Sequence, residues 1–349
     1  MQGCVSNLAG PVLLVLVALA GCSPSGPVSH DSLRLVAPEP SDGADPFPNW
    51  PLHPDRALEM MQTLAVEEIS VEGAGAGTTG AMKVDVRYHL DSAEAEFYVK
   101  GKRVPPRLDG INNAPRKELA AWELQRLFLD PTDYVVPATT ILCEPLSHYE
   151  GLDGGEAIPT VPGTSCIMFV LAVWLDDVTV ADVFYDEQRF LREPLYAYYL
   201  ANYNIFAYVI NNRDNRTGNV LVAKDDDNRR VFAIDNGVSF GTAWFNWFWP
   251  ATYRWRQIRV PALPRRTIDR LRELDRDDVD RLAVVLQLEA DDDGVLQAAE
   301  PGPPIDPDEG VRVQGTTVQF GLTDDEIDDV WERLEDLLED VDDGEIRLF

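Results

Sequence analysis

One short polar segment constrains the fold of this chain more than any other part of its sequence. It spans Asn211–Asn219 and follows Arg189–Ile210, a stretch of apolar and aromatic residues that predicts a long helix. The segment ends in an amide side chain five residues after Asp214. Further on, the apolar run Val231–Ile234 predicts a short strand that leads directly into Asp235. We therefore expect a helix, a polar loop and strands in this order, with two carboxylates and an amide at their ends.

The side chains of Asp214, Asn219 and Asp235 form a set that phosphoryl transfer requires. Such chemistry needs a carboxylate beside the attacking hydroxyl and two oxygen ligands that hold a metal on the phosphates. We assign Asp214 to the hydroxyl, and Asn219 and Asp235 to the metal. Their hard oxygen atoms suit Mg or Mn. Asn and Asp are also common turn residues, so a purely turn-forming role remains the alternative for both segments.

A glycine-rich segment upstream fits the same chemistry. Gly75, Gly77 and Gly80 have the spacing G-x-G-x-x-G, and the alternating residues Met82–Tyr88 that follow predict a strand rather than a helix. Backbone amides without side chains can approach phosphate oxygens closely, so we assign the three glycines to nucleotide binding. A plain hairpin loop is the alternative.

The remaining patterns predict an α+β fold. We expect a short helix leading into a strand over Met60–Val71, a strand at Ala95–Val99 and a helix at Pro115–Phe128. Val220–Ala223 predicts a strand. Two amphipathic helices are predicted in the C-terminal half, separated by an acidic, proline-rich loop: Thr267–Leu288, Asp324–Leu338 and the loop Glu289–Gly310.

These motifs, in this order, resemble the catalytic segments of protein-kinase-like enzymes. The pattern is most similar to the atypical branch that holds the phosphatidylinositol 3- and 4-kinases, the HipA-type kinases and the secretory-pathway casein kinases. The resemblance implies a bilobal fold with a small β-rich N-lobe at 56–175 and a helical C-lobe at 176–349. It also implies that ATP is a substrate together with Mg or Mn, and that Asp214 orients or deprotonates the acceptor hydroxyl.

The same resemblance implies roles for a lysine and a glutamate. Lys100 closes Phe97-Tyr98-Val99-Lys100 and would contact the phosphates, with Lys102 as the alternative on the same strand face. Glu118 precedes a paired Ala and a Trp in the predicted helix and would hold the lysine through an ion pair. The lipid kinases follow their catalytic Asp with Arg-His, where this chain has Asn215-Arg216. The acceptor therefore stays open between a protein hydroxyl and a lipid or small-molecule hydroxyl.

The N-terminus predicts export and a lipid anchor. A short apolar run, Val12–Ala20, overlaps Leu19-Ala20-Gly21-Cys22, which resembles the bacterial lipobox. This implies a signal peptide at 1–21, lipid attachment to Cys22 and a location in the cell envelope, at the outer membrane or periplasmic face. An uncleaved anchor is the alternative. The composition of Pro24–Pro51 predicts a disordered tether, which we place at 22–55.

The charge of the chain limits the classes of partner that it can bind, and its cysteines allow one disulfide. The chain carries 60 acidic and 30 basic residues, a formal net charge of −30, which argues against a nucleic-acid partner because phosphate backbones need a basic face. Export allows Cys143 and Cys166 to form a disulfide if the predicted strands Val135–Leu142 and Cys166–Trp174 are antiparallel neighbours. Two buried free thiols are the alternative.

We therefore expect an ATP- and metal-dependent phosphotransferase of the cell envelope. One alternative is a pseudokinase-type binding module that uses the acidic surface as an interface. The other is an enzyme that transfers AMP with the same fold.

Overall fold

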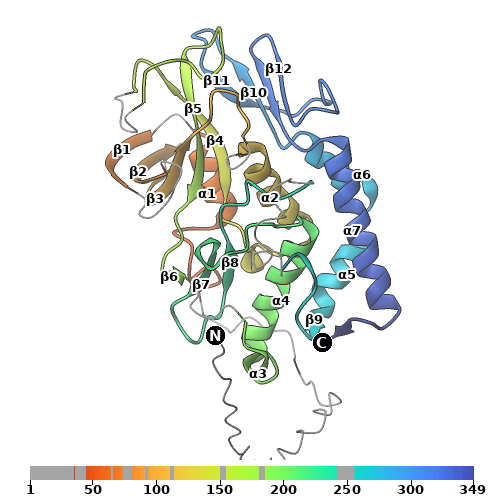
Figure 1. Ribbon diagram of the computed structural model, residues 1–349. Coiled ribbons are helices and arrows are strands. Elements are labelled where there is room, and N and C mark those ends of the chain that lie inside the picture. Colours follow the sequence, from red (N-terminus) through yellow and green to blue (C-terminus); the bar gives the residue numbers. More distant parts are fainter. Residues whose placement is uncertain are drawn as a thin grey trace, which may run out of the picture. The chain divides into compact units, whose positions relative to one another are not determined.

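The computed structural model has an α+β architecture in which mainly antiparallel sheets alternate with helical segments (Figure 1). All described residues belong to one compact unit of the chain, 34–349. None of the helices among them is long and apolar enough to cross a membrane. The structure describes residues 35, 45–63, 66–73, 81–90, 93–110, 114–149, 155–180, 185–241 and 255–349.

The largest sheet has five antiparallel strands in the order β1-β2-β3-β5-β4. Its strands are β1 (Val66–Gly73), β2 (Met82–Leu90), β3 (Ala93–Arg103), β4 (Thr139–Pro145) and β5 (Cys166–Val173). The predicted strands at Met82–Tyr88 and Ala95–Val99 are confirmed within the longer β2 and β3. On β3, Lys100 pairs in register with Lys83 of β2 and Ala172 of β5, so it is central in the sheet.

Two helices accompany this sheet. The first, α1 (Pro54–Met61), begins earlier than the helix predicted within Met60–Val71, and it starts with proline at its first position. The second, α2 (Pro115–Phe128), is confirmed at its predicted bounds. Its inner face buries Leu119, Ala120, Trp122, Leu124 and Phe128. This burial fixes the rotation of α2 and therefore the direction in which Glu118 points.

The strand predicted at Val135–Leu142 begins four residues late, at Thr139. The side chain of Gln125 on α2 explains the difference. Its oxygen accepts hydrogen bonds from the N–H groups of Val135 (2.7 Å) and Val136 (2.8 Å), and its amide donates to the Val136 carbonyl (2.9 Å). Backbone groups that would otherwise pair with a strand are thus satisfied by a buried side chain, which sequence periodicity does not reveal.

The long helix predicted at Arg189–Ile210 is split in two. A short helix, α3 (Glu187–Phe190), is followed by α4 (Pro194–Val209). Pro194 cannot continue a preceding helix but suits the first turn of a new one, which places the break. Nearly every residue of α4 is buried, so this helix forms the centre of the C-terminal half.

A small antiparallel sheet follows α4 and frames the polar loop. Its strands are β6 (Val178–Val180), β7 (Val220–Ala223) and β8 (Val231–Ala233), in that order. The prediction for β7 is confirmed, and β8 ends one residue before the predicted end. Because β7 follows the loop directly and β8 leads into Asp235, pairing of these strands brings both polar segments to one end of the sheet.

The helix predicted at Thr267–Leu288 is wrong. The chain instead forms α5 (Arg265–Glu273) and α6 (Arg276–Asp280), then turns into a strand. Asp275 starts α6 with a capping box, in which its side chain and that of Asp278 each accept the other's backbone N–H. The capping residues satisfy the free amides of a new helix, so the chain changes direction where the apolar pattern alone appears continuous.

The predicted loop Glu289–Gly310 is also partly wrong, because it contains strand residues. A four-stranded antiparallel sheet with the order β11-β10-β13-β12 occupies this region. Its strands are β10 (Leu286–Ala290), β11 (Leu296–Ala299), β12 (Val311–Gln314) and β13 (Thr317–Phe320). Leu286, Leu288 and Phe320 from this sheet pack in one hydrophobic cluster with Leu119 of α2 and Met168 of β5.

The structure joins Cys143 of β4 and Cys166 of β5 by a disulfide inside this cluster, with Cα atoms 5.4 Å apart. The N–H of Leu296 donates to the sulfur of Cys166 at 3.3 Å. Sequence-distant parts, 104–170 and 286–320, therefore share one core.

The chain ends with α7 (Asp324–Asp342) and a parallel pair of short strands, β9 (Ala262–Leu263) and β14 (Arg347–Leu348). The helix predicted at Asp324–Leu338 is confirmed and extends four residues further. Thr323 and Glu326 form a capping box at its start. Its buried face packs against α4 and α5, and Figure 1 shows it running beside α5 and α6.

Candidate functional site

Lys100 and Asp235 form an ion pair although they are 135 residues apart in the sequence. The Lys100 ammonium donates to Oδ1 of Asp235. The side chain of Lys100 is 25% exposed and that of Asp235 is 40% exposed, so both remain accessible to a ligand. Asp235 follows β8 and has a φ angle of 58°, a left-handed conformation that Asp tolerates better than most residues. The turn thereby aims a carboxylate at the central strand of the large sheet.

Glu118 holds the backbone on the other side of this turn. Its two carboxylate oxygens accept hydrogen bonds from the N–H groups of Asn236 (2.9 Å) and Gly237 (3.1 Å). Burial and the nearby charge of Asp235 raise the pKa of Glu118, while the charge of Lys100 and the Asn236 hydrogen bond oppose that rise. The expected direct ion pair between Glu118 and Lys100 is not formed. Glu118 instead positions Lys100's partner, Asp235, through the backbone.

Gly237 permits this close approach of α2 to the turn. A Cβ atom at position 237 would lie 3.3 Å from the backbone nitrogen of Ala114 and 3.4 Å from Oε1 of Glu118. The separation from Ala114 is tighter than ordinary packing, and that from Glu118 lies at the short end of ordinary contact. A larger residue would therefore push the turn away from the start of α2 and weaken the two hydrogen bonds to Glu118.

Asp214 and Asn219 are joined by direct hydrogen bonds. The Asn219 amide donates to Oδ2 of Asp214 (2.9 Å) and to its backbone carbonyl (3.0 Å). Asn219 in turn accepts the N–H of Ile234 through its backbone carbonyl at 3.0 Å, which connects the loop to the strand before Asp235. The five-residue spacing therefore closes a compact loop beside β8.

The Asp214 carboxyl is half-buried beside Arg216 and Asn219. Burial raises the pKa of the Asp214 carboxyl, and the charge of Asp235 adds to the rise, while Arg216 and the Asn219 hydrogen bond oppose it. The Arg216 guanidinium lies 3.4 Å from Oδ2 of Asp214 and is largely exposed. A bound cation would stabilise the ionised form of Asp214, which burial and the charge of Asp235 disfavour.

Three buried asparagines that sequence reasoning did not select build the loop. Asn212 donates to the Asn236 side chain at 3.1 Å and accepts the N–H of Asp214 at 3.0 Å. Asn215 donates to the Asn212 carbonyl (3.0 Å) and accepts from the hydroxyl of Tyr203 on α4 (2.5 Å). The many asparagines in 211–219 could have indicated such a loop, since buried amide side chains need hydrogen-bond partners.

Lys102 also faces the site. Burial lowers the pKa of its ammonium, the charges of Glu118 and Asp235 oppose this, and Lys100 adds to it. Lys100 and Lys102 thus both lie in the electrostatic field of Glu118 and Asp235. Lys100 is the one in direct contact with Asp235, which favours it for a phosphate contact.

Some predicted residues lie outside the described part of the chain. These are Gly75, Gly77 and Gly80 of the glycine-rich loop and the lipidation residue Cys22. Their assigned roles remain predictions.

The oxygen atoms of Asp214, Asn219 and Asp235 are of the kind that Mg²⁺ takes as ligands. Among the described residues, no group of three or more His, Cys, Asp or Glu is arranged to hold a metal by itself. Asp235 and Asn219 offer oxygens, and Asp214 adds a second carboxylate close by. Mg²⁺ is commonly held by one or two carboxylates together with phosphate oxygens and water, so two protein ligands are sufficient.

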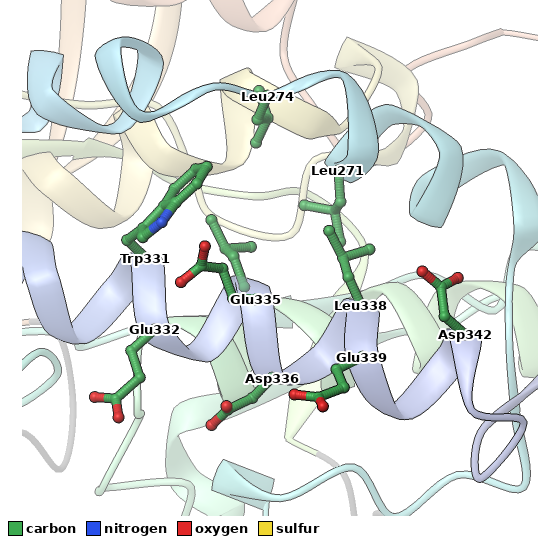
Figure 2. A pocket seen from close by; sticks show the side chains of 10 residues that line it. Leu271, Leu274, Trp331, Glu332, Glu335, Asp336, Leu338, Glu339 and Asp342 are labelled. Carbon is green, nitrogen blue, oxygen red and sulfur yellow. The ribbon is translucent and has the colours of Figure 1, made fainter.

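A groove of about 650 Å³ lies elsewhere, between α5 and α7. Figure 2 shows Trp331 and Leu338 of α7 facing Leu271 and Leu274, with acidic side chains along α7. None of the predicted site residues lines it. We assign the site by the polar groups that pair with one another around Asp235 rather than by this groove, because desolvated ionisable groups with specific charge partners mark functional sites.

Comparison of the chain with protein-family models and with curated proteins finds no match.

Proposed function

We propose that this chain is an ATP- and metal-dependent phosphotransferase with a bilobal, protein-kinase-like fold. In this proposal the five-stranded sheet and α2 form the N-lobe, and the part built around α4 forms the C-lobe. The acceptor is a hydroxyl group of a protein, a lipid or a small molecule.

One observation carries the proposal. Lys100, Glu118, the Asp214–Asn219 pair and Asp235 come from four separate segments, and direct contacts or mutual electrostatics connect them in one place. Structural ion pairs arise anywhere on a surface. A lysine, a half-buried glutamate and two further carboxylates beside a left-handed turn form an arrangement suited to a charged ligand.

The proposed chemistry assigns a task to each group. The acceptor oxygen attacks the γ-phosphorus of ATP, a new P–O bond forms, and the bond to the ADP oxygen breaks. Asp214 orients the hydroxyl and takes its proton. Lys100 releases Asp235 and contacts phosphate oxygens, and Glu118 keeps the turn of Asp235 in place. A divalent ion held by Asn219 and Asp235 would supply charge neutralisation on the phosphates.

The test uses the purified full-length chain in detergent. It is incubated with Mg or Mn, cell-envelope extract, and ATP labelled in the γ- or the α-phosphate. We expect transfer of the γ-label to an acceptor. Transfer of the α-label alone would replace the proposal with AMP transfer, and nucleotide binding without transfer of either label would indicate a pseudokinase.

A matched pair of lysine variants controls the test. Lys100→Met should weaken ATP binding by about tenfold or more, because it removes a charge-assisted contact to phosphate. Lys224→Met removes a lysine that is 59% exposed, and ATP binding should stay within twofold of the parent protein. Equal binding by both variants would contradict the proposed site.

The cell-envelope location is tested separately. Cys22→Ser removes the thioether position of the proposed lipid anchor, so the variant should be left unprocessed or released from membranes. Membrane fractionation with mass analysis of the N-terminus measures this. A fully processed Cys22→Ser protein that still sediments with membranes would exclude lipidation at this residue.

A further inference from the structure

A buried ion cluster connects α2 to the start of α7. Its centre is Arg116, whose side chain is only 10% exposed. The guanidinium donates to both carboxylate oxygens of Glu326, to Asp109 at 2.8 Å and to the carbonyl of Gly321 at 3.3 Å. A Cβ atom at Gly310 would lie 2.5 Å from Cζ of Arg116. The surrounding backbone is therefore built closely around this one guanidinium.

Lys117 extends the cluster to the segment that follows Asp235. Its ammonium lies 3.2 Å from Oε1 of Glu326 and donates to the backbone carbonyl of Phe240 at 2.8 Å. Phe240 and Gly241 both have positive φ angles, of 53° and 76°. A Cβ atom at Gly241 would lie 3.2 Å from Glu326, so this stretch of backbone packs directly on the glutamate.

The cluster therefore lies next to Glu118 on α2 and next to the turn whose N–H groups Glu118 binds. Arg116 and Lys117 immediately precede Glu118 on α2, and the backbone that Glu118 holds, at Asn236 and Gly237, leads into Phe240. The Glu326 carboxylate of α7 thus restrains the first helical turn of α2. Through Lys117 it also restrains the backbone at Phe240, where the segment after Asp235 ends.

A second contact of α7 reaches the loop that carries Asp214. The Asn211 amide, oriented with its oxygen toward the nearby donors, accepts hydrogen bonds from Arg333 of α7 at 3.0 Å and from Arg213 at 2.9 Å. Asn211 has a φ angle of 48° and follows Ile210, the C-cap residue of α4. Helix α7 therefore contacts the loop of Asp214 where it begins, at Asn211, and the segment after Asp235 where it ends, at Gly241.

We propose that Glu326 is a positioning residue which, through Arg116 and Lys117, holds α2 where Glu118 can bind the turn after Asp235. The inference rests on the proposed function for its catalytic consequence. Its structural content, that Glu326 controls the bonds between Glu118 and the turn, stands apart from any activity.

Hydrogen–deuterium exchange of the full-length chain measures those bonds directly. The N–H groups of Asn236 and Gly237 are protected by Glu118, so Glu118→Ala should raise their exchange and serves as the positive control. Glu326→Ala should raise exchange at the same two amides by about tenfold or more, because charge-assisted bonds that hold α2 are lost.

A neighbouring acidic residue supplies the matched control. Asp328 lies on the same helix, is 65% exposed and pairs with Arg276 at the surface, so Asp328→Ala should leave exchange at Asn236 and Gly237 within twofold. Unchanged protection in a folded Glu326→Ala protein would overturn the proposal. If that variant fails to fold, exchange at the same two amides is measured in Lys117→Met, which removes the bond to Phe240 and leaves the Arg116–Glu326 pair intact. Raised exchange supports the proposal, and unchanged exchange overturns it.

Kinetics separate positioning from general stability. Glu326→Ala should lower kcat by about tenfold or more with KM for ATP within threefold, because a small displacement of the site costs rate more than binding. Lys117→Arg, which keeps a donor near Phe240, should retain more activity than Lys117→Met. If the parent protein transfers no phosphoryl group, the proposed function fails, while the exchange experiment still decides the role of Glu326.

Discussion

Two acid-rich regions of this protein differ sharply in what surrounds their carboxylates. In the candidate site, Glu118 and Asp214 are desolvated enough for burial to raise their pKa, and Asp235 pairs with a lysine. On α7, beside the groove, Glu332, Asp336 and Glu339 are exposed, and Figure 2 shows their side chains on the side of the helix turned away from Leu271 and Leu274. These three side chains make no hydrogen bond or ion pair with other described residues.

Charge alone does not locate chemistry in a strongly acidic chain. With 60 acidic residues, clusters of carboxylates are expected over much of the surface. A carboxylate becomes useful when the protein restricts its solvation and fixes its partners, since both change its protonation and its affinity for cations.

The largest expected effect is the loss of transfer in Asp235→Ala. This change removes a proposed metal ligand and the partner of Lys100, so the phosphate charge is left poorly neutralised. Turnover in the labelled-ATP assay should fall by about a thousandfold or more. Asp336→Ala, the matched change on α7, should leave turnover within twofold. Comparable losses in both variants would remove the distinction between the two regions.

Asp214→Ala should have a smaller effect that falls on transfer rather than binding. Losing a positioned base lowers the rate by about a hundredfold or more. Calorimetric titration with Mg·ATP should give a dissociation constant close to that of the parent protein, since Asp214 is assigned to the acceptor hydroxyl. A large loss of nucleotide affinity would instead place Asp214 among the metal ligands.

The Glu326 cluster should make stability depend on pH. Burial disfavours ionised Glu326, but hydrogen bonds and charges from Arg116 and Lys117 outweigh it, so its pKa lies below the ordinary value of 4.5. Ionised Glu326 therefore stabilises the fold above about pH 4.5, and this contribution is lost as the pH falls through the lowered folded value.

Urea unfolding of the parent protein and Glu326→Gln measures that contribution. At pH 7 we expect the variant to be less stable by about 2–4 kcal/mol, since Arg116 and Lys117 lose a buried partner. The difference should shrink below pH 4.5, with Asp109 as the remaining carboxylate beside Arg116. A difference that stays constant down to pH 3 would show that the ionised pair is not its source.

The smallest effect is expected for the acidic face of α7. The triple change Glu332→Gln, Asp336→Asn and Glu339→Gln should alter the free energy of unfolding by about 0.5 kcal/mol or less per residue, because these side chains are exposed and unpaired among the described residues. Transfer should be unchanged. A strong loss of transfer to one class of acceptor would instead identify this face as an acceptor-binding surface.

Local structure was largely predictable where a repeating pattern and its end signals agree. The bounds of α2 and β7 matched the prediction, and the start of α7 coincides with its capping box. Prediction failed where a cap or a buried side chain intervened. Asp275 starts a new helix inside an apparently continuous one, and Gln125 replaces strand pairing at Val135 and Val136.

The sequence by itself determined the types of side chain available for chemistry and the local spacing of Asp214 and Asn219, because a short loop closes through neighbouring backbone. Only the tertiary structure decided that Lys100 pairs with Asp235 and that Glu118 binds the turn backbone rather than Lys100. These partners are more than a hundred residues apart in the chain. Which of several nearby charges become partners depends on the burial and rotation of α2. Those depend on a core assembled from two distant parts of the chain, 104–170 and 286–320.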